Sequence, residues 1–99
     1  MYFVKVRVEH AGLTEKELWD LWEKEAEAAL KAKSAGKIKF LYKITGQRGV
    51  IMVVDMEHHE IEQTVHGDMP MRNIMVLEEV IPVRDYEEFA EDVKRRWKK

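Results

Sequence analysis

The chain has 99 residues, of which 45% are hydrophobic, and this length supports one compact domain but not two. Its 17 basic and 19 acidic residues give a net charge of −2, so the chain as a whole does not attract nucleic acid or an anionic membrane. The absence of cysteine excludes disulfides, thiolate catalysis and thiolate metal sites, and it is compatible with a cytoplasmic protein.

The N-terminal segment alternates as a β-strand does. Val4, Val6 and Val8 are separated by charged residues, so one face of a strand over residues 2–9 is expected to be buried. No apolar run approaches the length that crosses a bilayer, and the first residues lack the continuous apolar region of a leader peptide. We therefore expect an unprocessed cytoplasmic protein that does not bind a membrane.

The next segment predicts a long helix. Thr14 and Glu17 have the spacing of a capping box and Gly36 is a typical stop, so this helix is expected to begin near residues 13–15 and end at Ser34. On a helical wheel Glu25 lies at the centre of the apolar face. The other members of that face are Leu18, Leu21, Trp22, Ala28, Ala29 and Ala32.

Glu25 is the strongest functional candidate in the sequence. A carboxylate that is removed from water either gains a partner or has its pKa raised into the range that suits a general base. Trp22 would give such a base an apolar wall. Two other interpretations stay open: the helix is rotated so that Glu25 reaches the rim, or Glu25 pairs with a lysine of the sheet, Lys37 or Lys39.

A hairpin follows, and its strands are apolar on both faces. Alternation over residues 38–44, a turn at residues 46–49 and the apolar run Val50–Val54 predict two antiparallel strands. Leu41 and Tyr42 are neighbours, and successive strand residues point to opposite faces. Because helices cover only one face of such a sheet, the other face is expected to pack against the sheet of a second subunit or to line a ligand cavity.

The second half of the chain predicts two more helices around a strand. Ile61 and Val65 share a face of a short helix expected over residues 56–66, and after a loop the run Ile74–Val83 predicts a fourth strand. From Asp85 a tail helix is expected to dock on another surface, because its apolar residues share one face. These residues are Tyr86, Phe89, Ala90, Val93 and Trp97.

The order of the elements is that of an α+β, ferredoxin-like fold. The pattern β-α-β-β-α-β forms a four-stranded antiparallel sheet with both main helices on one face, followed here by a C-terminal helix. We expect a single domain over residues 1–99, with the ferredoxin-like core in residues 1–83 and the C-terminal helix in residues 84–99.

Other clusters have simpler explanations than a ligand site. His58, Glu62 and His66 lie on successive turns of the short helix, but this polar side is expected to be solvated, so no metal site is predicted. His66 remains a candidate for a pocket rim. Basic residues near the C-terminus complement the helix dipole. The strand Val50–Val54 has no aromatic residue, unlike the base-stacking strands of RNA-recognition domains, so no nucleic-acid partner is expected.

Several short segments resemble the muconolactone delta-isomerase family, and they extend up to about Val83. They are Phe3 to Val8, Lys24-Glu25, Ser34 to Lys37, Tyr42 to Gly46 and Val53 to Asp55. The resemblance implies a dimeric α+β barrel, in which the sheets of two ferredoxin-like subunits pair, and assembly into a larger homo-oligomer. The tail helix from Asp85 onward exceeds what the family usually has.

The resemblance also implies an activity. The family reaction moves a double bond within a butenolide: a base takes a proton at one end of an allylic system and a proton returns at the other, and no metal or organic cofactor is required. In register with Gly36 and Gly46, a family glutamate of the active-site pocket matches Glu25, which would be the proton shuttle for a small-molecule substrate. The candidate substrate-binding residues are Trp22, Lys37, Tyr42 and His66.

The chain departs from the family pattern after the second predicted strand. Where the family typically has Tyr-Ala-Asn and a following Ser, this chain has Arg48, Gly49, Val50 and Met52. The loss of the Asn and Ser removes hydrogen bonds that would orient a substrate. The natural substrate therefore need not be muconolactone.

Two other classes of function stay open besides an isomerase of aromatic-compound catabolism. A non-catalytic barrel that binds a small ligand would have the same cavity without turnover. Other dimeric barrel proteins, such as small monooxygenases or haem-handling proteins, form the third class. Fold alone does not separate these classes.

Overall fold

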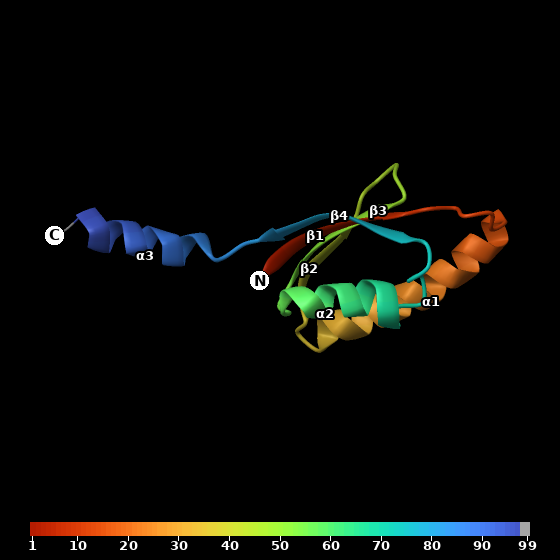
Figure 1. The fold of residues 1–99 in the computed structure, drawn as a ribbon, viewed down its shortest axis with the longest axis horizontal. Coiled ribbons are helices and arrows are strands. Elements are labelled where there is room, and N and C mark those ends of the chain that lie inside the picture. Colours follow the sequence, from red (N-terminus) through yellow and green to blue (C-terminus); the bar gives the residue numbers. More distant parts are fainter. Residues whose placement is uncertain (98–99) are drawn as a thin grey trace.

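In the computed structural model, which describes residues 1–97, four strands form one antiparallel sheet in the order β2-β3-β1-β4. The elements are β1 (Tyr2–Val8), α1 (Glu15–Ser34), β2 (Ile38–Lys43), β3 (Gly49–Val54), α2 (His58–Gln63), the π-helix η1 (Thr64–Asp68), β4 (Met75–Pro82) and α3 (Tyr86–Trp97). Helices α1 and α2 lie on the same side of the sheet (Figure 1). This arrangement confirms the predicted ferredoxin-like α+β fold.

Local interactions set both ends of α1, as the sequence predicts. The Thr14 hydroxyl accepts a hydrogen bond from the Glu17 amide at 3.2 Å, and the Glu17 carboxylate accepts one from the Thr14 amide at 3.0 Å. After the C-cap residue Ala35, Gly36 has a φ of +83°, which favours glycine. Within residues 1–97, neither this 20-residue helix nor any other is long and apolar enough to cross a membrane.

The short helix after β3 differs from the continuous helix predicted over residues 56–66. The α-helix covers only His58–Gln63, and the chain continues as one wide π-helical turn over Thr64–Asp68. The turn closes with a hydrogen bond from the Met69 amide to the Thr64 carbonyl at 3.0 Å. Such wide turns occur often at functional sites, and both Thr64 and Val65 line a cavity here.

Both edge strands have a β-bulge, which simple alternation of the sequence does not predict. In β2 the pairing with β3 shifts between Ile38 and Phe40, so that Ile38 and Leu41, three residues apart, face the same side. That side is covered by the helices, whereas Phe40 and Tyr42 face the opposite side of the sheet. β4 has a comparable shift against β1.

The core lies between the helices and the face of the sheet that they cover, the inner face. One buried cluster consists of Val4, Val6, Ile38, Val54, Ile61 and Val65. A second consists of Val8, Leu18, Met71 and Ile74. The second cluster brings the loop before β4 against the N-terminal half of α1, which positions the site described below.

The tail helix α3 projects away from the rest of the chain (Figure 1), so that the molecule measures 62 × 26 × 20 Å. It does not pack extensively on another helix or strand of its own chain, so the expected docking of this helix does not occur within one subunit. Tyr86 and Phe89 contact each other edge to face and are 75% and 42% exposed. The Trp97 side chain, predicted in the same apolar face, and residues 98–99 lie outside the described part.

Candidate functional site

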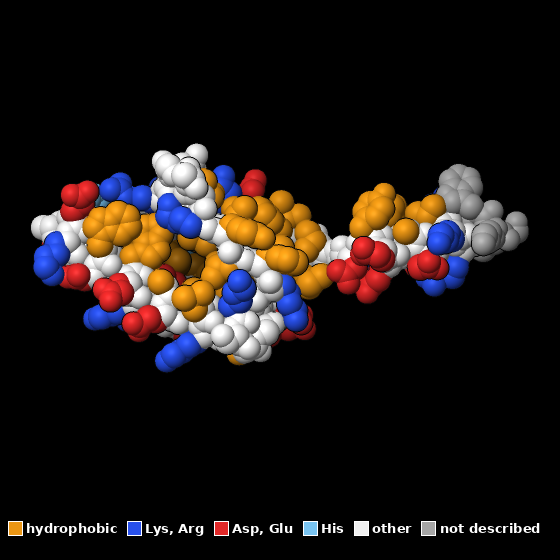
Figure 2. All heavy atoms as spheres, turned by 180° about the vertical axis from the view of Figure 1, so that it is seen from behind, with side chains coloured by type: hydrophobic (Ala, Val, Ile, Leu, Met, Phe, Trp, Pro, Cys, Tyr) orange, Lys and Arg blue, Asp and Glu red, His pale blue; other side chains and the backbone are white. Residues whose placement is uncertain are grey.

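A cavity of about 350 Å³ lies between α1, the α2–η1 segment and the inner face of the sheet. Its walls are almost entirely alanine, valine, leucine, isoleucine and methionine side chains, together with two tryptophans. The remaining lining residues are Glu25, Lys43 and Thr64. A hollow bordered mainly by hydrophobic side chains is visible on the body of the molecule (Figure 2). This volume and lining are typical of a site for a small, largely apolar ligand.

Glu25 is the one buried charged residue in the described chain, with 5% of its surface exposed. Its Oε1 accepts a hydrogen bond from the backbone amide of Met71 at 2.9 Å. Among residues 1–97 no lysine or arginine forms an ion pair with it, so Glu25 does not pair with Lys37 or Lys39. Its burial also excludes a position on the rim. The carboxylate is therefore held by one neutral donor.

Burial raises the pKa of Glu25 above its ordinary value, because the ionised form loses solvation. The Met71 amide opposes this shift, since it donates to the charged form. The second oxygen, Oε2, has no hydrogen-bond partner in the described residues and is not among the fully enclosed atoms. Oε2 is therefore accessible, and Glu25 lines the cavity.

The donor to Glu25 comes from a part of the chain that sequence reasoning did not connect to it. Met71 is fully buried beside Leu18 in the second core cluster, and the turn around it is closed by a hydrogen bond from the Ile74 amide to the Met71 carbonyl at 2.9 Å. Packing of the loop on α1 therefore fixes the donor. No sequence pattern signals an amide 46 residues away from its acceptor.

Trp22 lines the cavity together with Glu25, one turn away on the same helix. Its ring stacks on that of Trp19 with the centroids 5.6 Å apart. The Lys43 Nζ lies 5.7 Å from the Trp22 ring centroid, within the range of a cation–π contact. The two tryptophans of α1 and Lys43 of β2 thus meet at one part of the cavity lining.

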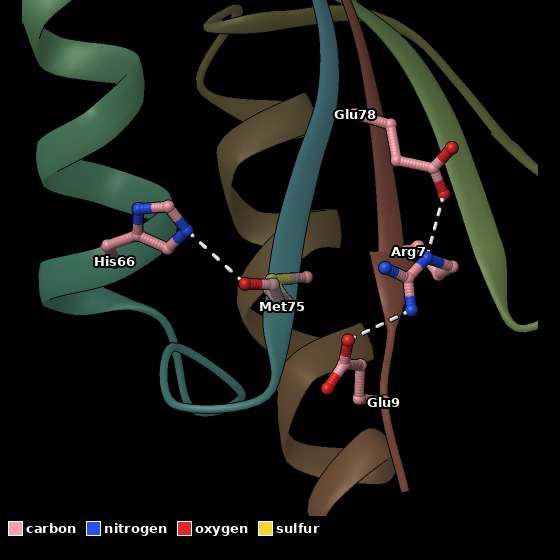
Figure 3. A network of polar contacts seen from close by, with 5 residues as sticks. All are labelled: Arg7, Glu9, His66, Met75 and Glu78. Atoms are coloured by element: carbon pink, nitrogen blue, oxygen red, sulfur yellow. Dashed lines mark hydrogen bonds and ion pairs between the residues drawn. The ribbon is translucent and has the colours of Figure 1, made fainter. Parts of the chain in front are cut away.

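The other candidate residues from the sequence do not line this cavity. Lys37 is exposed just before β2, and Tyr42 is 60% exposed on the opposite, outer face of the sheet. The His66 Nε2 lies 3.3 Å from the carbonyl oxygen of Met75 (Figure 3), and its ring borders a separate depression with Leu77. The structure brings Trp22 to Glu25, and it leaves Lys37, Tyr42 and His66 elsewhere.

Lys43 and Thr64 are polar lining residues that the sequence did not single out. Regular alternation along β2 groups Lys43 with residues opposite Ile38, but the bulge turns Lys43 and Ile38 to the same face. Thr64 belongs to the π-helical turn, which the sequence did not predict. The strand carries two lysines, Lys39 and Lys43, so the sequence alone does not show which of them faces the cavity; the bulge decides it.

The histidines of α2 and η1 lie on the exposed side of that segment. His58 stacks on Tyr2 with the ring centroids 5.2 Å apart, and Glu62 and His66 are exposed. Across residues 1–97 no three His, Asp or Glu side chains are grouped so as to hold a metal ion.

A comparison with known protein families shows which family this chain belongs to. The family model for muconolactone delta-isomerase matches residues 1–88. The chain belongs to the muconolactone delta-isomerase family. The match covers the whole sheet and both helices of the body and ends in the first turn of α3. No curated protein sequence matches the chain.

Proposed function

We propose that this protein is a cofactor-free isomerase that shifts a carbon–carbon double bond in a small lactone or a related unsaturated acid. Membership of the muconolactone delta-isomerase family supports this class of reaction. The observation that carries the proposal is the carboxylate of Glu25, buried without a cationic partner in the described chain and open to an apolar cavity.

Glu25 supplies the base. A bound butenolide presents an acidic C–H to Oε2; Glu25 takes this proton, the electron pair delocalises into a dienolate, and Glu25 returns a proton at the other end of the allylic system. The raised pKa suits both steps, because a stronger base removes the proton and the resulting acid gives it back. The Met71 amide holds the carboxylate in one orientation throughout the exchange.

The developing charge on the lactone oxygen needs a donor. Thr64 is the one hydroxyl-bearing residue among those lining the cavity, which supports it for this role. The sequence-derived candidates Lys37, Tyr42 and His66 lie outside the cavity of one subunit, so a role for them in substrate binding requires a second subunit.

The lining offers a substrate fewer hydrogen bonds than the family pattern does. Val50 and Met52 line the cavity in the segment where the family typically has polar Asn and Ser. These side chains offer no hydrogen bond, and only three charged or hydroxyl-bearing residues remain in the lining. We therefore propose a small unsaturated lactone or acid with few polar groups.

The substitution Glu25→Gln tests the base. Glutamine keeps the size of the side chain and still accepts the Met71 amide hydrogen bond, but it does not take up a proton. We expect a loss of about 10²- to 10⁴-fold in kcat. A panel of butenolides incubated in D₂O and followed by NMR measures both isomerisation and deuterium incorporation, so it detects proton abstraction even without net turnover.

Glu23→Gln is the matched control, because Glu23 is an exposed glutamate on the same helix. Its activity and fold are expected to equal those of the parent protein. If Glu25→Gln incorporated deuterium as fast as the parent, Glu25 would not be the base.

The second candidate function is a non-catalytic ligand-binding protein. The scarcity of polar groups in the cavity favours it, since few donors are available to stabilise a dienolate. A thermal shift with butenolides, combined with no isomerisation and no deuterium incorporation, would support this candidate over the isomerase.

Self-association as a homodimer or larger homo-oligomer is the partner relation we propose. The outer face of the sheet supports it, because Phe40 and Tyr42 are 57% and 60% exposed there, with Ile81 at 46%. Exposed aromatic residues of this kind are typical of surfaces between subunits.

A further inference from the structure

Among the described residues, Lys43 is the only cationic one that lines the Glu25 cavity. It is the last residue of β2, and Glu25 belongs to α1 on the opposing wall. The two charges do not form an ion pair, so each is available to a molecule lying between them.

Two backbone carbonyl oxygens hold the Lys43 ammonium group in place. Its Nζ donates to the carbonyl of Ile44 at 2.8 Å and to the carbonyl of Gln47 in the hairpin turn. The Trp22 ring lies beneath it at 5.7 Å. An ammonium group has three donors, so one N–H remains for a ligand, and no carboxylate among residues 1–97 pairs with it.

We propose that Lys43 is a positioning residue that binds the carboxylate of an unsaturated organic acid, with the apolar body of the acid in the cavity and its acidic C–H beside Glu25. This inference rests on the proposed function for the role of Glu25. It adds the group that orients the substrate.

Charge balance supports this orientation. An anionic ligand in an apolar cavity beside Glu25 meets a like charge, and the ammonium group of Lys43 in the same lining offsets that repulsion. Lys43 and Glu25 belong to different elements and form no ion pair, so a carboxylate bound at Lys43 leaves Glu25 free for another part of the ligand. The reactive carbon chain, which carries no full charge, is then the part that reaches the base.

The test compares muconolactone with its primary carboxamide, which has nearly the same shape and no negative charge. Binding is measured by titration calorimetry in the Glu25→Gln background, where turnover is blocked, and kcat and KM are measured in the parent background. With Lys43→Met we expect affinity for the acid to fall about 10- to 100-fold and affinity for the carboxamide to change little. In the parent background KM for the acid rises and kcat changes less.

Two matched variants complete the experiment. Lys43→Arg keeps the positive charge and is expected to restore most of the preference for the acid. Lys39→Met removes an exposed lysine from the same strand, outside the cavity lining, and is expected to change neither ligand's affinity. The ratio of acid to carboxamide affinity is insensitive to the fraction of folded protein, so it remains informative if Lys43→Met weakens the hairpin.

Equal loss of acid and carboxamide binding in Lys43→Met would overturn the proposal and leave Lys43 with only its role in the hairpin turn. Equal affinity of the unsubstituted Lys43 protein for the two ligands, or no binding of either, would also overturn it. If the acid binds through Lys43 but the parent protein neither isomerises it nor exchanges deuterium, the positioning role stands and the proposed isomerase function fails.

Discussion

Both faces of the sheet carry apolar side chains, but only those of the inner face are buried within one subunit. On the inner face Val4 and Val6 are fully buried beneath the helices, and the space left over forms the Glu25 cavity. On the outer face Phe40 and Tyr42 are exposed, beside a strip where Arg7 pairs with Glu78 at 3.1 Å and with Glu9 at 3.0 Å (Figure 3). Apolar composition therefore indicates a surface to be covered, and the topology decides which surface becomes core and which stays open.

Paired valine-to-alanine substitutions measure this difference most directly. Val6→Ala on the inner face is expected to lower the free energy of unfolding by about 2 kcal/mol, because it leaves a cavity in the core. Val53→Ala on the neighbouring strand faces outward and is expected to cost less than half as much at low protein concentration. Urea unfolding followed by circular dichroism gives both values. Equal costs would contradict the distinction between the faces.

Charge on the outer face is expected to break self-association. Phe40→Lys together with Tyr42→Lys places two cations on the proposed subunit interface, and the dimer dissociation constant should rise at least about tenfold. Sedimentation velocity over a range of concentrations measures it. Thr45→Lys with Gln47→Lys adds the same charge in the exposed hairpin turn and should leave association unchanged. An unaltered dimer in the first variant would exclude this face as the interface.

The inner face predicts a pH dependence that the outer face does not. Because the folded pKa of Glu25 lies above its ordinary value of 4.5, the folded state gains stability as pH falls through the folded pKa and loses it as pH rises. Glu25→Gln removes this loss, so the variant should be more stable than the parent at neutral pH, with the difference shrinking toward pH 4.5. Thermal unfolding across this range checks the sign; a variant less stable at neutral pH would contradict it.

Prediction from sequence worked where neighbouring residues decide the structure. The capping box of Thr14 and Glu17 and the stop at Gly36 gave the bounds of α1, and helical periodicity alone placed Glu25 on the buried face. Periodicity failed in β2, because a bulge turned Leu41 and Lys43 to the inner face. A bulge is stabilised by pairing with another strand, so it leaves no clear local signal.

The sequence by itself determined the fold class and the position of one carboxylate on an apolar helix face, because both follow from periodicity and short-range hydrogen bonds. The family followed from the resemblance of short segments and from the match over residues 1–88. Only the tertiary structure decided what surrounds that carboxylate. The Met71 amide reaches it from 46 residues away, and Lys43 rather than Tyr42 lines its cavity. The physical reason is that both contacts depend on how the loop before β4 packs on α1 and how β2 pairs with β3, which are properties of segments distant in the chain.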